Sequence, residues 1–292
     1  MGEDVFKGMA SAHGAASGTV SEAAASPSGM CCVTPVEMDQ LVPLFKGMDE
    51  TMILSCLQGF MGKAWADRLP KPSCARIITG DCCFFAGQPN EALVAGSFAD
   101  HSVAFLLCIC EGDAWHPLIE RCFSGRFNRF NRYALRKEPD VFSRERLHAF
   151  ESSLPAGYAL VPLRGDLVQA VGKHEWSRDF VSNFRDADDF EARGLGWVVL
   201  HEGEPVCGAS SYTVYREGIE IQIQTREDHQ RRGLARACAA KLILDCLARG
   251  LYPSWDAANP ESLALAEQLG YHFSHAYVTY EVFAASAPIH PD

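Results

Sequence analysis

The 292-residue sequence contains no apolar run near the roughly 20 residues that a membrane-spanning helix needs. Its N-terminal stretch is rich in Ala, Ser and Gly and lacks the run of about 7–15 apolar residues found in a secretory signal. A myristoylation site is not indicated, because Phe6 stands where Ser or Thr is required. We therefore expect a soluble cytoplasmic protein with no membrane partner and a disordered tail over residues 1–34.

Positive charge is scarce: the chain has 26 Lys and Arg against 37 Asp and Glu, which gives a net charge of −11. This balance argues against nucleic acid as a partner. One short stretch nevertheless contains four cations, namely Arg226, Arg231, Arg232 and Arg236. A local cluster of arginines in an acidic protein indicates a site for a small anion.

Zinc-finger spacings are missing as well, because the twelve cysteines include no C-x-x-C pair and do not cluster with histidines. Two pairs are vicinal, Cys31-Cys32 and Cys82-Cys83, and most of the others are scattered over apolar stretches. Such cysteines are typical of buried, reduced side chains in a reducing cytosol. We expect no metal site. A cysteine-based metal or redox protein is an alternative that bound metal would reveal.

The first half of the chain, residues 35–155, is predicted to form an α/β domain. Its periodicity indicates a helix near 49–62, strands at 75–87, 91–98 and 102–110, and a helical region from Pro117 to Phe150. In that helical region Arg126, Arg129 and Arg132 recur at i, i+3 spacing. The row favours a solvated helix face, with a substrate or partner contact as the alternative.

The second half, residues 156–286, is predicted to form another domain, followed by a tail over 287–292. The expected order is a strand at 157–163, helical periodicity up to Gly194, a three-strand meander at 196–225, a helix up to Gly250, a short strand, a helix capped by Asn259, and a final strand or strand pair up to Phe283. This order predicts a mixed α/β sheet with helices on its faces.

The strand-to-helix turn around Gly233 has the features of a phosphate site. A helix that starts directly after a strand presents about four unpaired N–H groups, and its dipole favours an anion there. Gly233 lets the backbone approach closely, and the neighbouring arginines add charge-assisted hydrogen bonds. Neither a Gly-Lys-Ser/Thr loop nor a G-x-G-x-x-G fingerprint is present, so a phosphate loop of another kind is indicated.

The hexapeptide Gln230-Arg231-Arg232-Gly233-Leu234-Ala235 resembles the Gln/Arg-x-x-Gly-x-Gly/Ala pyrophosphate loop of the GNAT superfamily of acetyl-CoA-dependent N-acetyltransferases. The run from Trp255 to Phe273 resembles the Asn-containing second block of that fold. The resemblance covers about residues 157–283 and implies a GNAT-like mixed sheet flanked by helices. It also implies that an additional α/β domain, a degenerate GNAT-like one, precedes the catalytic domain.

The resemblance implies that a primary amine of a small molecule or peptide attacks acetyl-CoA directly. Backbone groups of Gln224 and Thr225 would pair with the pantetheine arm, and one N–H there would stabilise the thioester oxygen. Asn259 and Ser262 would reach the same arm. The pyrophosphate would be held by the loop residues Gln230, Arg231, Arg232, Gly233, Leu234, Ala235 and Arg236.

An alkylammonium has a pKa near 10, so the reaction needs a base. In the strand at 218–225 the isoleucines take one face, and Glu220, Gln222 and Gln224 take the other. A buried central strand is usually apolar on both faces, so the polar row indicates a lined groove. Glu220 is the predicted base, and a solvated strand face without a role is the alternative.

Many members of the superfamily carry an acidic tyrosine four residues before the glycine that ends the short helix, where this chain has Ala266. The proton donor would then be Tyr271, Tyr277, Tyr280 or water, and the sequence leaves these open. Because of Ala266, a non-catalytic acyl-CoA-binding sensor is the alternative function. His229, beside the loop, is expected at the surface.

Overall fold

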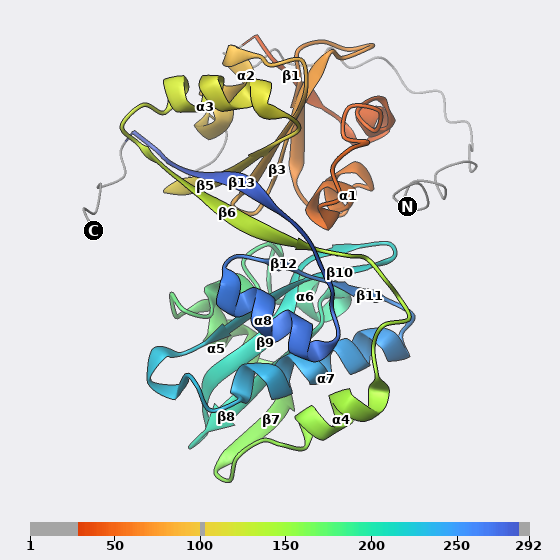
Figure 1. Ribbon diagram of the computed structural model, residues 1–292, viewed down its shortest axis with the longest axis vertical. Coiled ribbons are helices and arrows are strands. Elements are labelled where there is room, and N and C mark those ends of the chain that lie inside the picture. The colour runs from red at the N-terminus through yellow and green to blue at the C-terminus, as the bar shows by residue number, and fades with distance from the viewer. Residues whose placement is uncertain (1–28, 100–102, 286–292) are drawn as a thin grey trace.

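A computed structural model describes residues 29–99 and 103–285 and shows two β-sheets, one above the other (Figure 1). The first sheet has eight strands in the order β1-β2-β3-β4-β5-β13-β6-β12, and the second has five in the order β11-β10-β9-β8-β7. Both sheets mix parallel and antiparallel pairs and are flanked by helices. The mixed α/β fold predicted from the sequence is confirmed.

The strands of the first sheet are β1 (Cys31–Val33), β2 (Lys63–Ala66), β3 (Cys74–Thr79), β4 (Cys82–Gly87), β5 (Phe105–Cys110), β6 (Phe127–Leu135), β12 (Asp256–Ala257) and β13 (Phe273–Phe283). Helix α1 (Thr51–Leu57) packs on one face of this sheet. Helices α2 (Glu91–Ala95) and α3 (His116–Cys122) pack on the other. Each face of strands β2 to β5 is covered by its own apolar cluster, so this part of the first sheet is buried on both sides.

The strands of the second sheet are β7 (Tyr158–Pro162), β8 (Gly196–His201), β9 (Glu204–Tyr215), β10 (Gly218–Thr225) and β11 (Tyr252–Ser254). The helices around it are α4 (Arg144–Glu151), α5 (Asp166–Gly172), α6 (Ala187–Arg193), α7 (Leu234–Ala248) and α8 (Pro260–Leu269). The meander β8-β9-β10 and the helix before Gly250 appear where the sequence predicts them. Asn259 caps α8 as expected, since its side chain accepts a hydrogen bond from the Ser262 amide at 2.8 Å.

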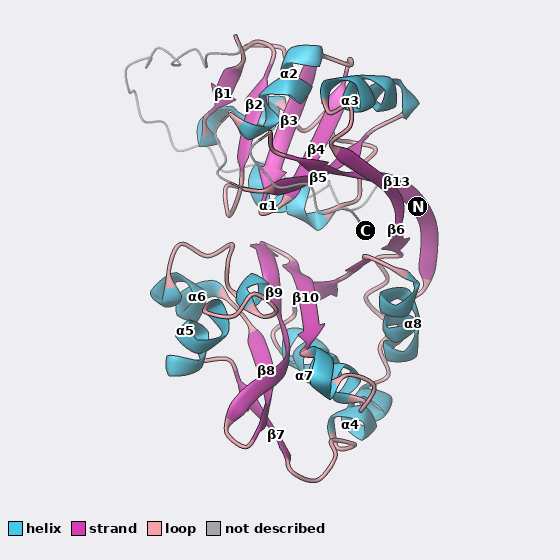
Figure 2. Ribbon diagram, turned by 90° about the vertical axis from the view of Figure 1, so that its left-hand side faces the viewer, coloured by secondary structure: helices cyan, strands magenta, loops and turns pink. Residues whose placement is uncertain are grey.

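The last strand is placed differently from the prediction. Residues 273–283 are predicted to belong to the second domain, but β13 pairs antiparallel with β6 and β5 inside the first sheet. Figure 2 shows β6 and β13 running together along one side of the molecule, from the first sheet down to α8. The chain therefore leaves the second sheet after α8 and completes the first sheet with its final strand.

The helical region predicted from Pro117 to Phe150 is wrong in its middle, because residues 127–135 form strand β6. Its sequence, FNRFNRYAL, repeats every three residues and is ambiguous alone, and nine pairings with β13 decide for a strand. The arginines of this region do not share one solvated face, because Arg132 is largely buried whereas Arg129 is exposed. Arg126 donates to the Phe283 carbonyl at 2.7 Å, Arg129 lies 3.5 Å from Glu120, and Arg132 donates to Asp256 at 2.6 Å.

Two further predictions need correction. Residues 91–98, predicted as a strand, form α2 and a following 3-10 turn, because Asn90 caps the first helical amides. Residues 31–33, predicted as part of the N-terminal tail, form β1 and pair with β2. The remaining tail predictions, for residues 1–28 and 287–292, lie outside the described residues.

Candidate functional site

Strands β10 and β11 meet at one end only. Their parallel register joins Gly218, Ile219 and Glu220 to residues 252–254, and no further pair follows among the described residues. On its other side β10 pairs with β9 as far as Thr225. The edge of β10 from Ile221 to Thr225 therefore has free backbone groups on the side where the two strands diverge.

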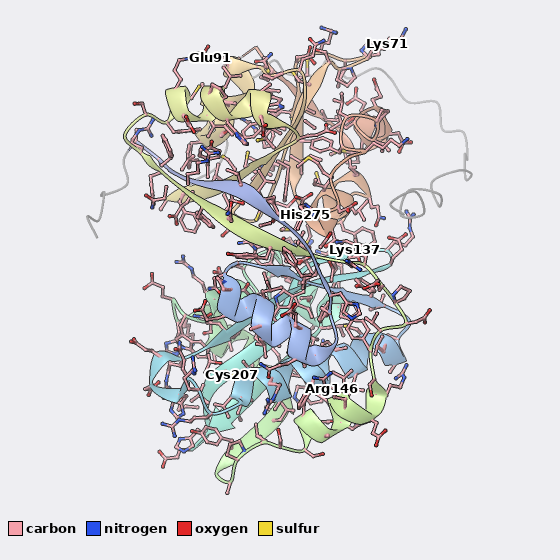
Figure 3. All side chains as sticks on the ribbon, in the orientation of Figure 1. Lys71, Glu91, Lys137, Arg146, Cys207 and His275 are labelled. Atoms are coloured by element: carbon pink, nitrogen blue, oxygen red, sulfur yellow. The ribbon has the colours of Figure 1, made fainter. Side chains whose placement is uncertain are left out.

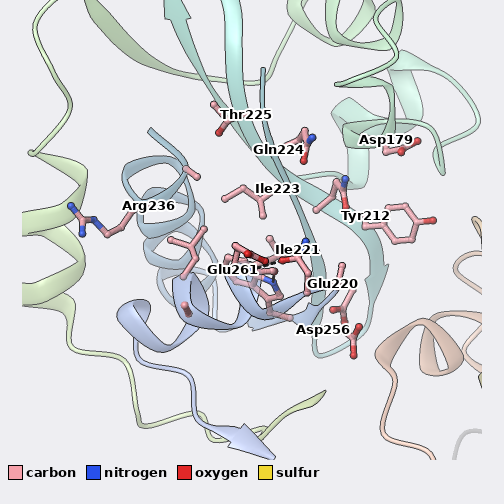
Figure 4. Close-up of a pocket in the computed structure, with 18 of the residues that line it drawn as sticks. Asp179, Tyr212, Glu220, Ile221, Ile223, Gln224, Thr225, Arg236, Asp256 and Glu261 are labelled. Atoms are coloured by element: carbon pink, nitrogen blue, oxygen red, sulfur yellow. Dashed lines mark hydrogen bonds between the residues drawn. The ribbon is translucent and has the colours of Figure 1, made fainter. Parts of the chain in front are cut away.

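A pocket of about 860 Å³, here called the first pocket, lies along this free edge. Its walls are β10 from Glu220 to Thr225, the loop before α7, the first turn of α7, and α8 with the segment before it. Figure 4 shows Thr225, Gln224, Ile223 and Ile221 following one another along β10 toward Glu220. Residues of the first half, among them Met52 and Arg132, close the end beside Glu220.

The loop before α7 presents unpaired amides to the first pocket. None of the amides from Arg231 to Arg236 donates a hydrogen bond to an acceptor within residues 29–99 or 103–285. Gly233 has φ +79° and Arg231 has φ +62°, so two positions of this short loop adopt the left-handed conformation. The amides at the start of the 15-residue helix α7 thus form a cradle suited to an anion.

The four arginines of this region divide into two pairs. Arg231 and Arg236 line the first pocket, and Arg236 also donates to Gln268 at 3.1 Å. Arg232 points elsewhere, to the Tyr158 hydroxyl at 3.2 Å and the Asp228 carbonyl at 3.1 Å. Arg226 is paired with Asp228 at 2.7 Å. The local cluster of four cations expected from the sequence therefore reduces to two at the cradle.

The other predicted binding residues also border the first pocket. Gln224, Thr225 and Gln230 line it, and Gln230 donates to the Thr225 carbonyl at 3.3 Å. Asn259 and Ser262 line the opposite wall. Ser262 accepts a hydrogen bond from Trp255 Nε1 at 3.2 Å, so its hydroxyl is fixed in place. Leu234 and Ala235 complete the first turn of α7 at the pocket, with Leu234 buried.

Glu220 lies at the inner end of the first pocket and is 4% exposed, so the solvated-face alternative is wrong. Its Oε2 accepts a hydrogen bond from the Thr51 hydroxyl at the start of α1. Its Oε1 accepts none within normal geometry, although Ser254 is near enough to lower the pKa. Desolvation is the largest effect and raises the pKa of Glu220 above 4.5. A buried carboxylate with one free oxygen is suited to accept a proton.

A second pocket of about 1090 Å³ meets the first at Met52, Glu220, Trp255 and Asp256. Its other walls come mainly from the first half and from β13. Asp256, at the junction, accepts hydrogen bonds from Arg132 at 2.6 Å and from the Tyr277 hydroxyl at 2.6 Å. Sequence reasoning missed Thr51 and Asp256 as site residues, because nothing in the local pattern shows that they reach Glu220.

Glu50, at the start of α1, lines the second pocket and is half-buried. Its Oε2 is shielded from solvent and accepts no hydrogen bond from the described residues. Desolvation, with a smaller contribution from the charge of Asp256, raises the pKa of Glu50 to about 7, and the charge of Lys137 opposes this. The folded protein therefore binds a proton at Glu50 more tightly than the unfolded chain does.

Glu50→Gln should stabilise the protein at alkaline pH. An ionised Glu50 opposes folding above pH 7, and the penalty disappears below about pH 4.5, where the carboxyl is neutral in both states. The full shift corresponds to about 3 kcal/mol, and partial exposure reduces the expected gain to about 1–2 kcal/mol at pH 8. Urea unfolding of both proteins at pH 5 and pH 8 measures it. The exposed neighbour variant Asp49→Asn is the control, and an equal gain at both pH values would contradict the expectation.

The three tyrosines considered as proton donors differ in position. Tyr271 is 2% exposed and donates to the Pro253 carbonyl at 2.5 Å, and Tyr280 donates to Glu120 in the first half. Only Tyr277 of the three lines a pocket, the second one. Ala266 is fully buried and does not face either pocket. His229, expected at the surface, is 7% exposed and contacts the Tyr158 hydroxyl at 2.9 Å.

Membrane-spanning helices and groups of metal ligands are both absent from residues 29–99 and 103–285. No helix in these ranges has the length and apolar character to cross a membrane. No group of three or more His, Cys, Asp or Glu side chains in the same ranges is placed to hold a metal ion. All twelve cysteines are unpaired.

The sequence and the fold both match known proteins. The model of the GNAT acetyltransferase family matches residues 42–280. The chain is 26% identical over 241 residues to the uncharacterized N-acetyltransferase YdfB of Bacillus subtilis (strain 168), covering 79% of this chain and 89% of that protein.

Solved structures of GNAT proteins are also similar to this chain. A GCN5-related N-acetyltransferase-like protein from Streptococcus suis 89/1591 is 40% identical with a TM-score of 0.80, covering 85% of this chain and 98% of that one. A tandem GNAT protein from the clavulanic acid biosynthesis pathway shares the fold, with a TM-score of 0.51 at 12% identity, covering 89% of this chain and 99% of that one.

Proposed function

This chain belongs to the GNAT acetyltransferase family, and we propose that it transfers an acetyl group from acetyl-CoA to a primary amine of a small molecule or peptide. The observation that carries the proposal is the first pocket, with bare amides at one end and a buried carboxylate at the other. Residues 156–286 would form the catalytic unit and 35–155 the supporting domain, with β13 shared. A reducing cytoplasm suits its twelve unpaired cysteines.

The donor fits the first pocket in the order of its chemical groups. The pyrophosphate would lie on the amides of residues 231–236, with the guanidinium groups of Arg231 and Arg236 beside it. Arg232 would contribute only its amide. The pantetheine arm would run along the free edge of β10 at Gln224 and Thr225 and pair with it as an added strand.

The opposite wall would hold the pantetheine arm from the side. Asn259 and Ser262 lie across the pocket from β10, and Gln230 orients the end of that strand through its bond to the Thr225 carbonyl. An arm laid in this direction brings the acetyl thioester to Glu220, at the junction of the two pockets. There a free β10 amide would stabilise the negative charge that develops on the thioester oxygen.

The chemistry at that junction is a direct attack. The acceptor ammonium releases one proton to Glu220, and the nitrogen lone pair then forms a bond to the acetyl carbon. The C–S bond breaks, its electron pair leaves with the CoA sulfur, and the thiolate takes up a proton. The amide nitrogen loses its second proton to solvent, which gives an acetamide, CoA and one released proton. The raised pKa of Glu220 brings its basicity closer to neutral pH.

A proton donor for the leaving thiolate is not required. A thiol has a pKa of about 8.5, so a thiolate is an acceptable leaving group near neutral pH. Burial and the charge of Asp256 raise the pKa of Tyr277 well above 10, which makes its hydroxyl a weak acid. We propose that water protonates the sulfur and that Tyr277 positions Asp256 through their 2.6 Å hydrogen bond.

The alternative function, a sensor that binds acyl-CoA without turnover, is motivated by Ala266 alone. A screen of primary amines with acetyl-CoA and detection of free thiol separates the two. We expect amine-dependent release of CoA well above the rate without amine. A protein that binds acetyl-CoA by calorimetry but releases no CoA with any amine of a broad panel would be a sensor.

A further inference from the structure

The second pocket is strongly acidic. Eight carboxylates and two cations, Arg136 and Lys137, are among its lining residues. Lys137 lies between the two sheets, as does His275 (Figure 3), and it forms no ion pair within 4.0 Å with any part of the chain that the structure describes. Asp256 is already paired with Arg132, so seven further acidic side chains face two cations, and a cation entering the pocket would be attracted.

Two carboxyl oxygens at the inner end of this pocket lack donors. Only 4% of Glu220 is exposed, and its Oε1 accepts no hydrogen bond from the described residues. Oε2 of Glu50 accepts none either. A buried acceptor without a donor is costly unless a ligand supplies one. An N–H donor on a cationic ligand would satisfy both oxygens with charge-assisted hydrogen bonds.

A second set of carboxylates lies further out and is solvent-exposed. Asp49 precedes α1, Glu111 and Asp113 follow β5, and Asp140 lies in the segment between β6 and α4. Asp113 has its whole side chain exposed, and its contact with His116 is long, at 3.9 Å. The pocket thus has acceptors at two depths, an inner pair beside the junction and an outer group at the rim.

We propose that the second pocket is the acceptor site and that its substrate is a small polycationic amine, with one ammonium at Glu220 and another at the rim carboxylates. That this amine becomes acetylated rests on the proposed acetyl transfer, whereas its binding in the second pocket does not. The cavity of about 1090 Å³ admits an acceptor larger than a simple monoamine. The first half of the chain then has a defined role, because it supplies most of the acceptor site.

The charged groups around the inner pair come from several elements. Lys137 from the β6–α4 segment lowers the pKa values of Glu50 and Glu220, and Asp256 raises both. His116 and His275 also line the pocket. An ammonium bound at Glu220 would favour its ionised form, so binding of the acceptor would itself prepare Glu220 to take a proton.

Two probes of equal length test the proposal: 1,6-diaminohexane carries two ammonium groups and hexylamine carries one. We expect kcat/KM with acetyl-CoA to be about fivefold higher for the diamine, because the exposed rim carboxylates attract its second ammonium group. Calorimetry with CoA present should show the same preference in binding, and this readout does not depend on turnover.

The double variant Glu111→Gln/Asp113→Asn removes two rim charges and should reduce the preference for the diamine to about twofold or less. The control Asp39→Asn/Glu145→Gln removes two exposed charges outside both pockets and should keep the preference. Equal binding of both probes to the wild type, or an unchanged preference in the rim variant, would overturn the inference. Selective diamine binding without any CoA release would instead refute acetyl transfer and leave the acceptor pocket standing.

Discussion

Replacement of Gly233 by glutamate should weaken acetyl-CoA binding by at least about 100-fold while the protein stays folded. A Cβ added at this position would meet only Arg236, whose Nη2 would lie 3.9 Å away, so the glutamate would extend into the anion cradle. Its carboxylate would compete with the pyrophosphate for the same amides and repel it. Isothermal calorimetry with acetyl-CoA measures the loss.

Strain is a second effect of this substitution, because φ at Gly233 is +79°. Gly203→Glu is a matched control, since Gly203 has φ +86° with no atom within 4 Å of an added Cβ and lies in the turn between β8 and β9. It carries the same strain and charge change away from the cradle. We expect similar thermal stability for both variants and normal acetyl-CoA affinity only for Gly203→Glu. Normal affinity in Gly233→Glu would place the pyrophosphate elsewhere.

Glu220→Gln should lower kcat by about 100-fold or more, which is the usual contribution of a general base, with little change in acetyl-CoA affinity. The pH profile carries the specific prediction. The wild-type rate should fall as the pH drops through the raised pKa of Glu220, because the protonated carboxyl cannot accept a proton. This acidic limb should be absent from the profile of the glutamine variant. Steady-state rates between pH 5 and 9 measure both effects.

Glu217→Gln provides the control for that variant. Glu217 is exposed in the turn before β10 and accepts a hydrogen bond from Gln58 at 2.9 Å, which glutamine can also accept. We expect a wild-type rate and pH profile for this variant. An acidic limb that persists in Glu220→Gln would show that another group, such as Glu50, takes the proton.

Much of the second half could be predicted from sequence because its signals are local. Turns at 202–204 and 216–218 delimit the meander, and Asn259, Pro260 and Gly270 mark the ends of α8. The first half was harder, since residues 127–135 form a strand only through pairing with β13, more than 130 residues later. Strand pairings between residues so far apart in sequence leave no local pattern from which the strand could be predicted.

The same distinction holds for the candidate site. Alternation in β10 identified Glu220, and the motif identified the loop around Gly233, because each depends on neighbours in sequence. Thr51 and Asp256 approach Glu220 from other parts of the chain and were not predicted. The sequence also could not show that Arg232 turns toward Tyr158, since both the loop conformation and the position of β7 determine that contact.

The position of β13 affects how the molecule can be made and divided. A polypeptide emerging from the ribosome cannot finish its first sheet until its last strand is released, so the half synthesised first must wait for the half synthesised last. Cutting the chain near residue 155 would leave the first piece with a gap between β5 and β6, where β13 belongs. The two halves therefore have to complete their folding together. The wall of the second pocket that includes residues 274–278 forms only once synthesis is complete.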